Sequence, residues 1–177
     1  MLQENLVIER LTEKDRNTFR STLYRFLIEI DNDFVPPLSQ RVSTTQLDFS
    51  EQRPPGHGFP YLDCLMRQKI ITASKGNSII GFLSYIEDFE DVEIGLPRSN
   101  YITTIAVSRP FREKGIGKLL YGEAFKDNRT FTTRTWTGDT AQIRNLEKFD
   151  FKPFKVIKNH RGPGIDTIYY IKYPDTV

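Results

Sequence analysis

The stretch of sequence that decides the fold is IAVSRPFREKGIGKLLYGEAF, residues 105–125. It opens with an apolar run typical of a buried strand, which is broken at Pro110. A helix is predicted after the turn, because Ile116, Leu120 and Ala124 follow at helical spacing. A strand, a glycine-containing turn and a helix in this order predict a backbone anion site at the start of the helix.

Two glycines and three cations give this turn its chemistry. The first turn of a helix has unpaired N–H groups, and the helix dipole favours negative charge there. Gly115 and Gly117 remove side chains that would keep a phosphate away from the backbone. Arg112, Lys114 and Lys118 add positive charge around the same point. We therefore expect the turn to hold a phosphate-bearing ligand.

Spacing excludes two familiar phosphate motifs. The P-loop requires G-x-x-x-x-G-K-[ST], but Arg112 stands where its first glycine belongs and Leu119 where its Ser or Thr belongs. The Rossmann fingerprint requires a third glycine where this chain has Leu120. The pattern that remains is R-x-x-G-x-G after a strand, which resembles the pyrophosphate-binding motif of the GNAT superfamily of N-acetyltransferases.

A second resemblance lies downstream, in DTAQIRNLEKFDFKPF, residues 139–154. This segment is similar to the family's next helix and strand, which typically begin with an Asn, carry a Tyr and end at a Gly-Phe pair. Here Asp139 stands at the Asn position, Leu146 at the usual Tyr position, and an Asp replaces the Gly. The resemblance covers residues 70–173, whereas residues 1–69 carry no matching motif.

The rest of the chain supplies the elements of a mixed sheet. Apolar alternation and turn signals, including a Gly76-Asn77 hairpin turn, predict strands at 5–11, 70–75, 78–86, 101–108, 131–137, 152–158 and 166–173. Helical spacing predicts helices from residue 13 to about 31, at 38–47, around 62–66, at 115–127 and at 139–148. Residues 50–60 contain two glycines and three prolines and are predicted to form an irregular loop.

The resemblance implies a more specific architecture than this order of elements. We expect a single GNAT-like domain over residues 1–177, of the α/β class (α+β by some schemes). Its mixed, mostly antiparallel twisted sheet would have about six or seven strands, flanked by about four helices.

Composition excludes several function classes. The net charge is only +2 and no dense basic run occurs in the sequence, so no nucleic-acid partner is expected. The single cysteine, Cys64, cannot form an intramolecular disulfide, which favours a reducing, cytoplasmic location. The N-terminus becomes charged too early for a signal peptide, and no apolar run is long enough to cross a membrane. His57 and His160 have no partner at ligand spacing, so no metal is expected.

The resemblance implies that acyl-CoA lies in a V-shaped gap between the strands at 101–108 and 131–137. Main-chain groups of Ile105, Ala106 and Val107 would pair with the pantetheine arm, and a backbone N–H near Val107 would hold the developing oxyanion. The pyrophosphate would be held by a set of seven residues. Asp139 is a further candidate for cofactor binding, although a helix N-cap is the preferred interpretation of this residue. The seven are Arg112, Glu113, Lys114, Gly115, Ile116, Gly117 and Lys118.

The implied function is an acyl-CoA-dependent N-acetyltransferase, in which a primary amine attacks acetyl-CoA directly. The family's catalytic carboxylate is replaced here by Tyr101, and Glu93 is the nearest acid that could substitute. A packing role for Tyr101 and a solvated role for Glu93 fit the sequence as well. Leu146 replaces the tyrosine that usually acts as the general acid. Either another tyrosine protonates the CoA thiolate, or the thiolate leaves without being protonated.

Partners are less narrowly defined. The acceptor would be a small-molecule or peptide amine, and the acidic residues at 87–93 could attract a cationic one. The proline- and glycine-rich loop at 53–60 could act as a lid. A homodimer is possible, since dimers are common among related proteins. Two alternatives stay open: an acyl-CoA sensor of the same fold without turnover, and an unrelated phosphate-binding domain.

Overall fold

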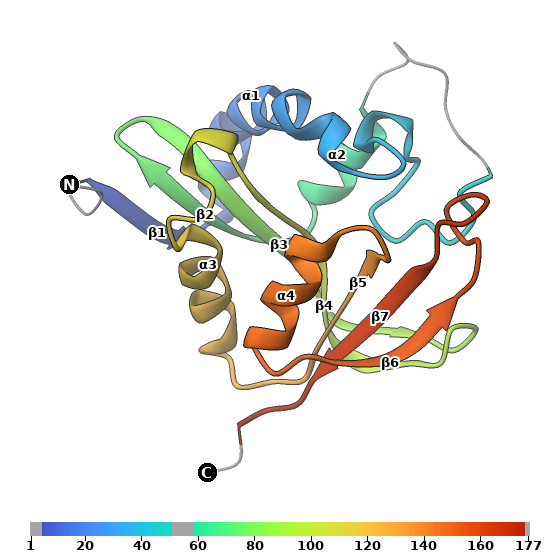
Figure 1. Ribbon diagram of the computed structural model, residues 1–177. Helices are drawn as coiled ribbons and strands as arrows, with labels where there is room; N and C mark the ends of the chain where they lie inside the picture. Colours follow the sequence, from blue (N-terminus) through green and yellow to red (C-terminus); the bar gives the residue numbers. More distant parts are fainter. Residues whose placement is uncertain (1–4, 51–58, 176–177) are drawn as a thin grey trace.

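A mixed β-sheet organises the computed structural model, which describes residues 5–50 and 59–175 (Figure 1). Within these residues seven strands form one sheet in the order β1-β2-β3-β4-β5-β7-β6. All neighbouring strands are antiparallel except β4 and β5, which are parallel. The predicted mixed, mostly antiparallel sheet is therefore confirmed. The strands are β1 Leu6–Arg10, β2 Lys69–Lys75, β3 Ser78–Asp91, β4 Leu96–Val107, β5 Phe131–Trp136, β6 Lys152–Ile157 and β7 Thr167–Lys172.

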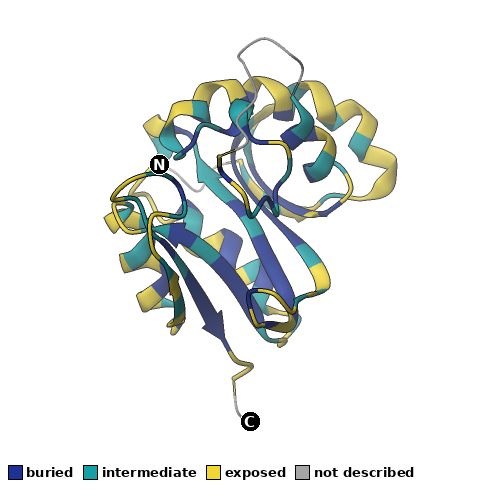
Figure 2. Ribbon diagram, turned by 90° about the vertical axis from the view of Figure 1, so that its right-hand side faces the viewer, coloured by how far each residue is buried: buried dark blue, intermediate teal, exposed yellow. Residues whose placement is uncertain are grey.

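Helices cover both faces of this sheet (Figure 1). In the described part of the chain these are α1 Glu13–Ile30, α2 Pro60–Leu65, α3 Ile116–Phe125 and α4 Thr140–Lys148. Single turns of 3₁₀-helix occur at η1 Asp31–Asp33, η2 Leu38–Gln40 and η3 Arg109–Phe111. Helices α1 and α2 pack on one face, and α3 and α4 pack on the other. Figure 2 shows the sheet as the buried layer and the outer sides of the helices as the exposed one.

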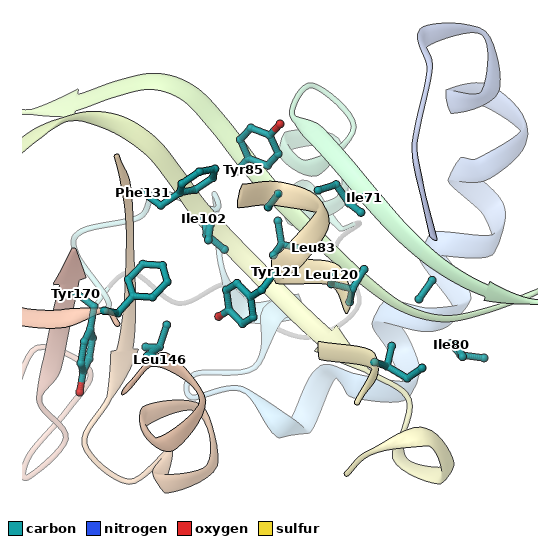
Figure 3. Close-up of a cluster of buried hydrophobic side chains, with 14 residues drawn as sticks. Ile71, Ile80, Leu83, Tyr85, Ile102, Leu120, Tyr121, Phe131, Leu146 and Tyr170 are labelled. Atoms are coloured by element: carbon teal, nitrogen blue, oxygen red, sulfur yellow. The ribbon is translucent and has the colours of Figure 1, made fainter. Parts of the chain in front are cut away.

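Each face of the sheet has its own hydrophobic core. Neighbouring residues of one strand serve different cores, because successive strand side chains point to opposite faces. Leu83 packs with Leu120 and Leu146 beneath α3 and α4 (Figure 3), whereas Phe82 packs with Leu27 beneath α1. The two cores fix the helices on both sides of β4 and β5, where the candidate site lies.

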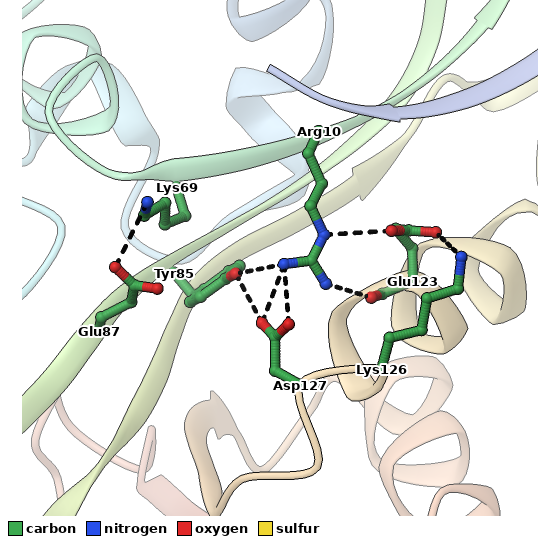
Figure 4. A network of polar contacts seen from close by, with 7 residues as sticks. All are labelled: Arg10, Lys69, Tyr85, Glu87, Glu123, Lys126 and Asp127. Atoms are coloured by element: carbon green, nitrogen blue, oxygen red, sulfur yellow. Dashed lines mark hydrogen bonds and ion pairs between the residues drawn. The ribbon is translucent and has the colours of Figure 1, made fainter. Parts of the chain in front are cut away.

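A polar network joins the C-terminal half of α3 to β1, the edge strand of the sheet (Figure 4). Nε of Arg10 donates to Glu123 at 3.1 Å, and Nη1 donates to Asp127 at 3.0 Å. The hydroxyl of Tyr85 donates to the same Asp127 carboxylate at 3.1 Å, and burial raises the pKa of Tyr85 to about 12. These bonds hold the C-terminal half of α3 against β1 and β3, and so help to set where its N-terminus points.

One predicted helix is wrong, and two predicted strands are longer in the structure. Residues 38–47 form only the short turn η2 and not a helix. The side chain of Gln46 accepts from the N–H of Val42 at 2.9 Å and donates to the carbonyl of Asp48, so it replaces helical backbone bonds. The strands predicted at 78–86 and 101–108 are too short, because β3 continues to Asp91 and β4 begins at Leu96. The predicted irregular loop and lid fall mainly on residues 51–58, outside the described residues.

Candidate functional site

A gap opens in the sheet where β4 and β5 part. The two strands pair only from Asn100–Ile102 to the facing residues 131–133. Beyond Ile102, β4 pairs only with β3, and Thr103 has no partner in that register because it forms a bulge. The exposed strand edges line a cleft of about 720 Å³ that reaches the N-terminus of α3. A gap of this kind leaves backbone donors and acceptors available to a ligand.

The glycine turn forms one end of the cleft. Gly115 has a φ of 82°, a left-handed conformation that glycine adopts without strain, and it caps the N-terminus of α3. A Cβ added at Gly117 would meet no atom within 4 Å, so the space beside the first turn is open. The unpaired N–H groups of that turn therefore border an open space that suits a phosphate.

An acidic residue from η1 pairs with two of the cations before α3. Asp33, in η1, accepts a hydrogen bond from Arg109 at 2.8 Å and a second from Arg112. Burial opposes the charge of Asp33, but these two bonds hold the pKa of its carboxyl below the usual value. Lys114 turns back to donate to the carbonyl of Pro110 at 2.7 Å. Arg112 is therefore already paired, and Lys118 is the turn cation that lines the cleft without a carboxylate partner in the described chain.

Most residues predicted to bind the acyl donor lie together. Lys114 is the one predicted donor-site residue that does not line the cleft. Asp139 lines it and also caps α4, since its carboxylate accepts from the N–H of Gln142 at 3.1 Å and from the hydroxyl of Thr135 at 3.2 Å. The residues that line the cleft as predicted are Ile105, Ala106, Val107, Arg112, Glu113, Gly115, Ile116, Gly117, Lys118 and Asp139.

The sequence profile of the acetyltransferase (GNAT) family matches residues 26–151, which is most of the chain and includes the whole glycine turn. This chain belongs to the GNAT family. Among curated protein sequences, none is significantly similar to it.

Solved structures support the same fold for this GNAT protein. An acetyltransferase of the GNAT family from Streptococcus pneumoniae matches with a TM-score of 0.65 at 16% identity, over 96% of this chain and 99% of that chain. A protein assigned to the GNAT family from Desulfovibrio desulfuricans gives a TM-score of 0.63 at 16% identity, over 95% and 98%. YncA from Salmonella typhimurium, solved with its cofactor acetyl-CoA, gives 0.63 at 10% identity, over 98% and 96%.

This GNAT protein differs from its relatives' usual pattern in α4. Leu146, at the usual tyrosine position, is fully buried in the core below α3 and does not line the cleft. The hydroxyl of Tyr121, on the same face, accepts a hydrogen bond from Gln142 at 2.8 Å within that core. Neither Leu146 nor Tyr121 lines the cleft, so neither position supplies a tyrosine hydroxyl to it.

The two predicted catalytic residues lie in different places. Glu93 is exposed in the turn between β3 and β4, at the opposite end of β4 from the cleft. Tyr101 is 2% exposed and stacks on Phe89, and burial raises its pKa to about 12. In the described residues the only buried side-chain nitrogen or oxygen without a hydrogen-bond partner is Nε of Arg16. Tyr101 is not among the residues that line the cleft, and its hydroxyl forms no hydrogen bond with a described residue.

Sequence reasoning missed three arginines that line the same cleft: Arg41, Arg134 and Arg161. They come from the segment after η2, from β5 and from the β6–β7 loop, so no local spacing connects them. One signal was present, because Arg134 is a single charge in the otherwise uncharged strand FTTRTW. A charged residue in the middle of a buried strand points to a binding or structural role.

The described residues contain neither a membrane-spanning helix nor a cluster of metal ligands. No helix there is both long and apolar enough to cross a membrane. Nor do three or more His, Cys, Asp or Glu side chains of that part of the chain come together as a metal site.

Proposed function

We propose that this chain transfers the acetyl group of acetyl-CoA to a primary amine by direct attack, as a single-domain, cytoplasmic enzyme. The observation that carries the proposal is the gap between β4 and β5, which opens onto the uncovered first turn of α3 at Gly117. The pyrophosphate would rest on that turn. The pantetheine arm would pair with the free edge of β4 at Ile105 and Ala106.

Chemistry would take place where the strands part. The thioester carbonyl would accept a backbone N–H near Val107, which stabilises the oxyanion as the amine attacks. Binding both reactants in one cleft replaces a collision between two molecules with a reaction inside a complex, and no covalent enzyme intermediate is needed.

Tyr101 is proposed as the proton donor to the departing CoA thiolate. With a pKa of about 12 its phenol is protonated at neutral pH, so it suits an acid better than a base. Tyr101 and Arg134 lie on the same face, because Tyr101 pairs with Thr132 and the residue two positions on points the same way. The earlier proposal of Glu93 as the base has less support, given its distant and exposed position.

Calorimetry with acetyl-CoA tests the donor site, and release of free CoA thiol over a library of amines tests transfer. We expect binding with 1:1 stoichiometry and turnover with at least one amine above the hydrolysis background. Absence of binding at millimolar acetyl-CoA would refute the donor assignment.

A second candidate function is an acyl-CoA sensor of the same fold. It is favoured by Leu146, which removes the usual acid from the cleft. Tight binding of acetyl-CoA without turnover on any amine in the library would select the sensor over the enzyme.

A further inference from the structure

Three arginines meet around one aromatic ring in the wall of the cleft. The guanidinium carbons of Arg41, Arg134 and Arg161 lie 5.7, 5.2 and 5.2 Å from the centroid of the Phe49 ring. Arg41 is 4% exposed and Arg161 is 7% exposed. The cleft thus contains three positive charges close together and largely removed from water.

No carboxylate balances these charges within the described chain. Over residues 5–50 and 59–175, no Asp or Glu forms an ion pair or hydrogen bond with any of the three arginines. Burial lowers the pKa of Arg41 to about 10 and that of Arg161 to about 9, so both still carry a proton at neutral pH. Buried like charges without a counter-ion cost free energy, and an anion bound between them would recover it.

Hydrogen bonds to the protein use only some of the N–H donors of Arg41 and Arg161. Arg41 donates to the carbonyls of Pro36 and Val35 at 3.0 and 3.2 Å, and Arg161 donates to Val35 at 2.8 Å. These bonds hold the loop that follows α1. A guanidinium has five N–H donors, so neither side chain is exhausted by them.

The hydrogen bonds of Arg134 within the protein are too weak to explain why an arginine stands at this position. Its two hydrogen bonds are long, at 3.3 Å to the hydroxyl of Tyr169 and 3.4 Å to the carbonyl of Thr44. Nε of Arg134 and Nη2 of Arg161 form no hydrogen bond in the described chain, and neither is a buried atom without a partner. Because Arg134 and Arg161 both line the cleft, these two atoms are donors that a bound group could use.

The arginines lie on the other side of the sheet from the glycine turn. Thr135 bonds to Asp139 at the start of α4, so its side chain points to the face that α3 and α4 cover. Arg134, the preceding residue in β5, points to the opposite face and reaches Thr44 in the segment between α1 and α2. The first turn of α3 and the arginines therefore lie on opposite sides of the gap between β4 and β5, within one cleft.

We propose that Arg41, Arg134 and Arg161 bind a carboxylate or phosphate group of the acceptor, so that the substrate is an acidic amine. This inference rests on the proposed acetyl transfer. The acidic residues at 87–93 do not offer a rival site for a cationic amine in the cleft, because none of them lines it. Two of them are also in ion pairs, Glu87 with Lys69 at 3.5 Å and Asp88 with Arg129 at 3.7 Å. The acidic residues at 87–93 suggested a cationic acceptor, whereas the arginines of the cleft favour an anionic one.

A matched panel of amines tests the proposal by CoA-thiol release. Amino acids are compared with their amides, aminoalkyl phosphates with the parent amino alcohols, and a polyamine series supplies cationic acceptors. We expect kcat/KM for the acidic members to exceed that of their neutral partners by about 100-fold or more. The carboxylate and phosphate arms then show which anion the site takes.

Arg134 is the residue to change, because its bonds contribute least to the fold. Arg134→Gln should raise KM for the acidic acceptor by about 10- to 100-fold, and Arg134→Lys should recover part of that loss. The affinity for acetyl-CoA, measured by calorimetry, should stay unchanged in both variants. Arg98→Gln is the control, since Arg98 is exposed near the start of β4, away from the cleft.

The outcomes separate this inference from the proposed function. Turnover that prefers neutral or cationic amines, while acetyl-CoA binds normally, would overturn the acidic acceptor and keep the acetyltransferase. A preference for a dicarboxylic acyl-CoA with neutral amines would also overturn it, because the anion would then belong to the donor. Loss of acetyl-CoA binding itself would reject the proposed function instead.

Discussion

Asp33 accepts a hydrogen bond from Nη2 of Arg112, and this bond joins the end of α1 to the glycine turn before α3. The same carboxylate accepts from Arg109, so one acidic residue engages two of the cations that precede α3. Asp33 also lines the cleft, where its negative charge faces the space proposed for the pyrophosphate.

Replacing Asp33 should therefore strengthen donor binding. In Asp33→Asn the repulsive charge is removed and Arg112 is released, so we expect acetyl-CoA to bind about 3- to 10-fold more tightly, or about 1 kcal/mol. Calorimetry at low ionic strength measures the change. Asp63→Asn is a suitable control, because Asp63 forms a surface ion pair with Arg20. Equal or weaker binding in Asp33→Asn would show that the carboxylate orients the turn and does not oppose the ligand.

The same residue predicts a pH-dependent stability. The pKa of Asp33 is lower in the folded protein than its ordinary value of 3.8, so its ion pairs stabilise the fold fully above about pH 4. That contribution, about 1 kcal/mol or less, is lost as the pH falls through the folded-state pKa. Urea unfolding of the native protein and Asp33→Asn should show a gap at pH 7 that closes below pH 4. A gap that stays constant over this range would contradict the assignment.

Gly117→Asp should abolish acetyl-CoA binding. A Cβ at this position meets no atom within 4 Å, so a side chain can start there without a clash, but aspartate places a carboxylate beside the proposed pyrophosphate site. We expect at least a 100-fold loss of affinity, about 2.7 kcal/mol, with little change in Tm. Gly122→Asp adds the same charge to an exposed and equally open position of α3 and should bind normally. Unchanged affinity in Gly117→Asp would mean that the ligand lies elsewhere.

Tyr101→Phe tests the proton donor. Loss of the hydroxyl should lower kcat about 10- to 100-fold, because the thiolate would then leave without protonation, and it should leave acetyl-CoA affinity unchanged. Tyr121→Phe removes a hydroxyl in the core below α3, on the other face of the sheet, and serves as the matched variant. If kcat survives in Tyr101→Phe, the residue has only a packing role against Phe89.

Leu146→Ala should reduce stability without touching the cleft. The side chain is fully buried in the larger core, and its loss leaves a cavity that costs about 2–5 kcal/mol. Leu119→Ala, at a position 44% exposed on α3, should cost far less. Urea unfolding monitored by circular dichroism compares the two, and similar losses would mean that α4 is not anchored through Leu146.

The glycine turn and the strand segments were predictable because their signals are local. Gly115 must adopt a left-handed conformation, and strand alternation follows a period of two that single segments reveal. The helix predicted at 38–47 was wrong because hydrogen bonds from the side chain of Gln46 hold the backbone of this segment in another conformation. Such side-chain bonds produce no periodic pattern in the sequence. The arginine cluster was out of reach for another reason. Arg41 and Arg161 meet only after the whole sheet has formed, and no local spacing encodes that meeting.

The short parallel pairing of β4 with β5 has a consequence for how the molecule resists unfolding. Strands β1–β4 and β5–β7 share only the pairs at residues 100–102 and 131–133, so this join is the weakest line across the sheet. A ligand lying in the gap contacts both sides of that line and must be released before they separate. Its binding free energy then adds to the free energy of unfolding. The resistance of this protein to heat would therefore follow the supply of its own substrate.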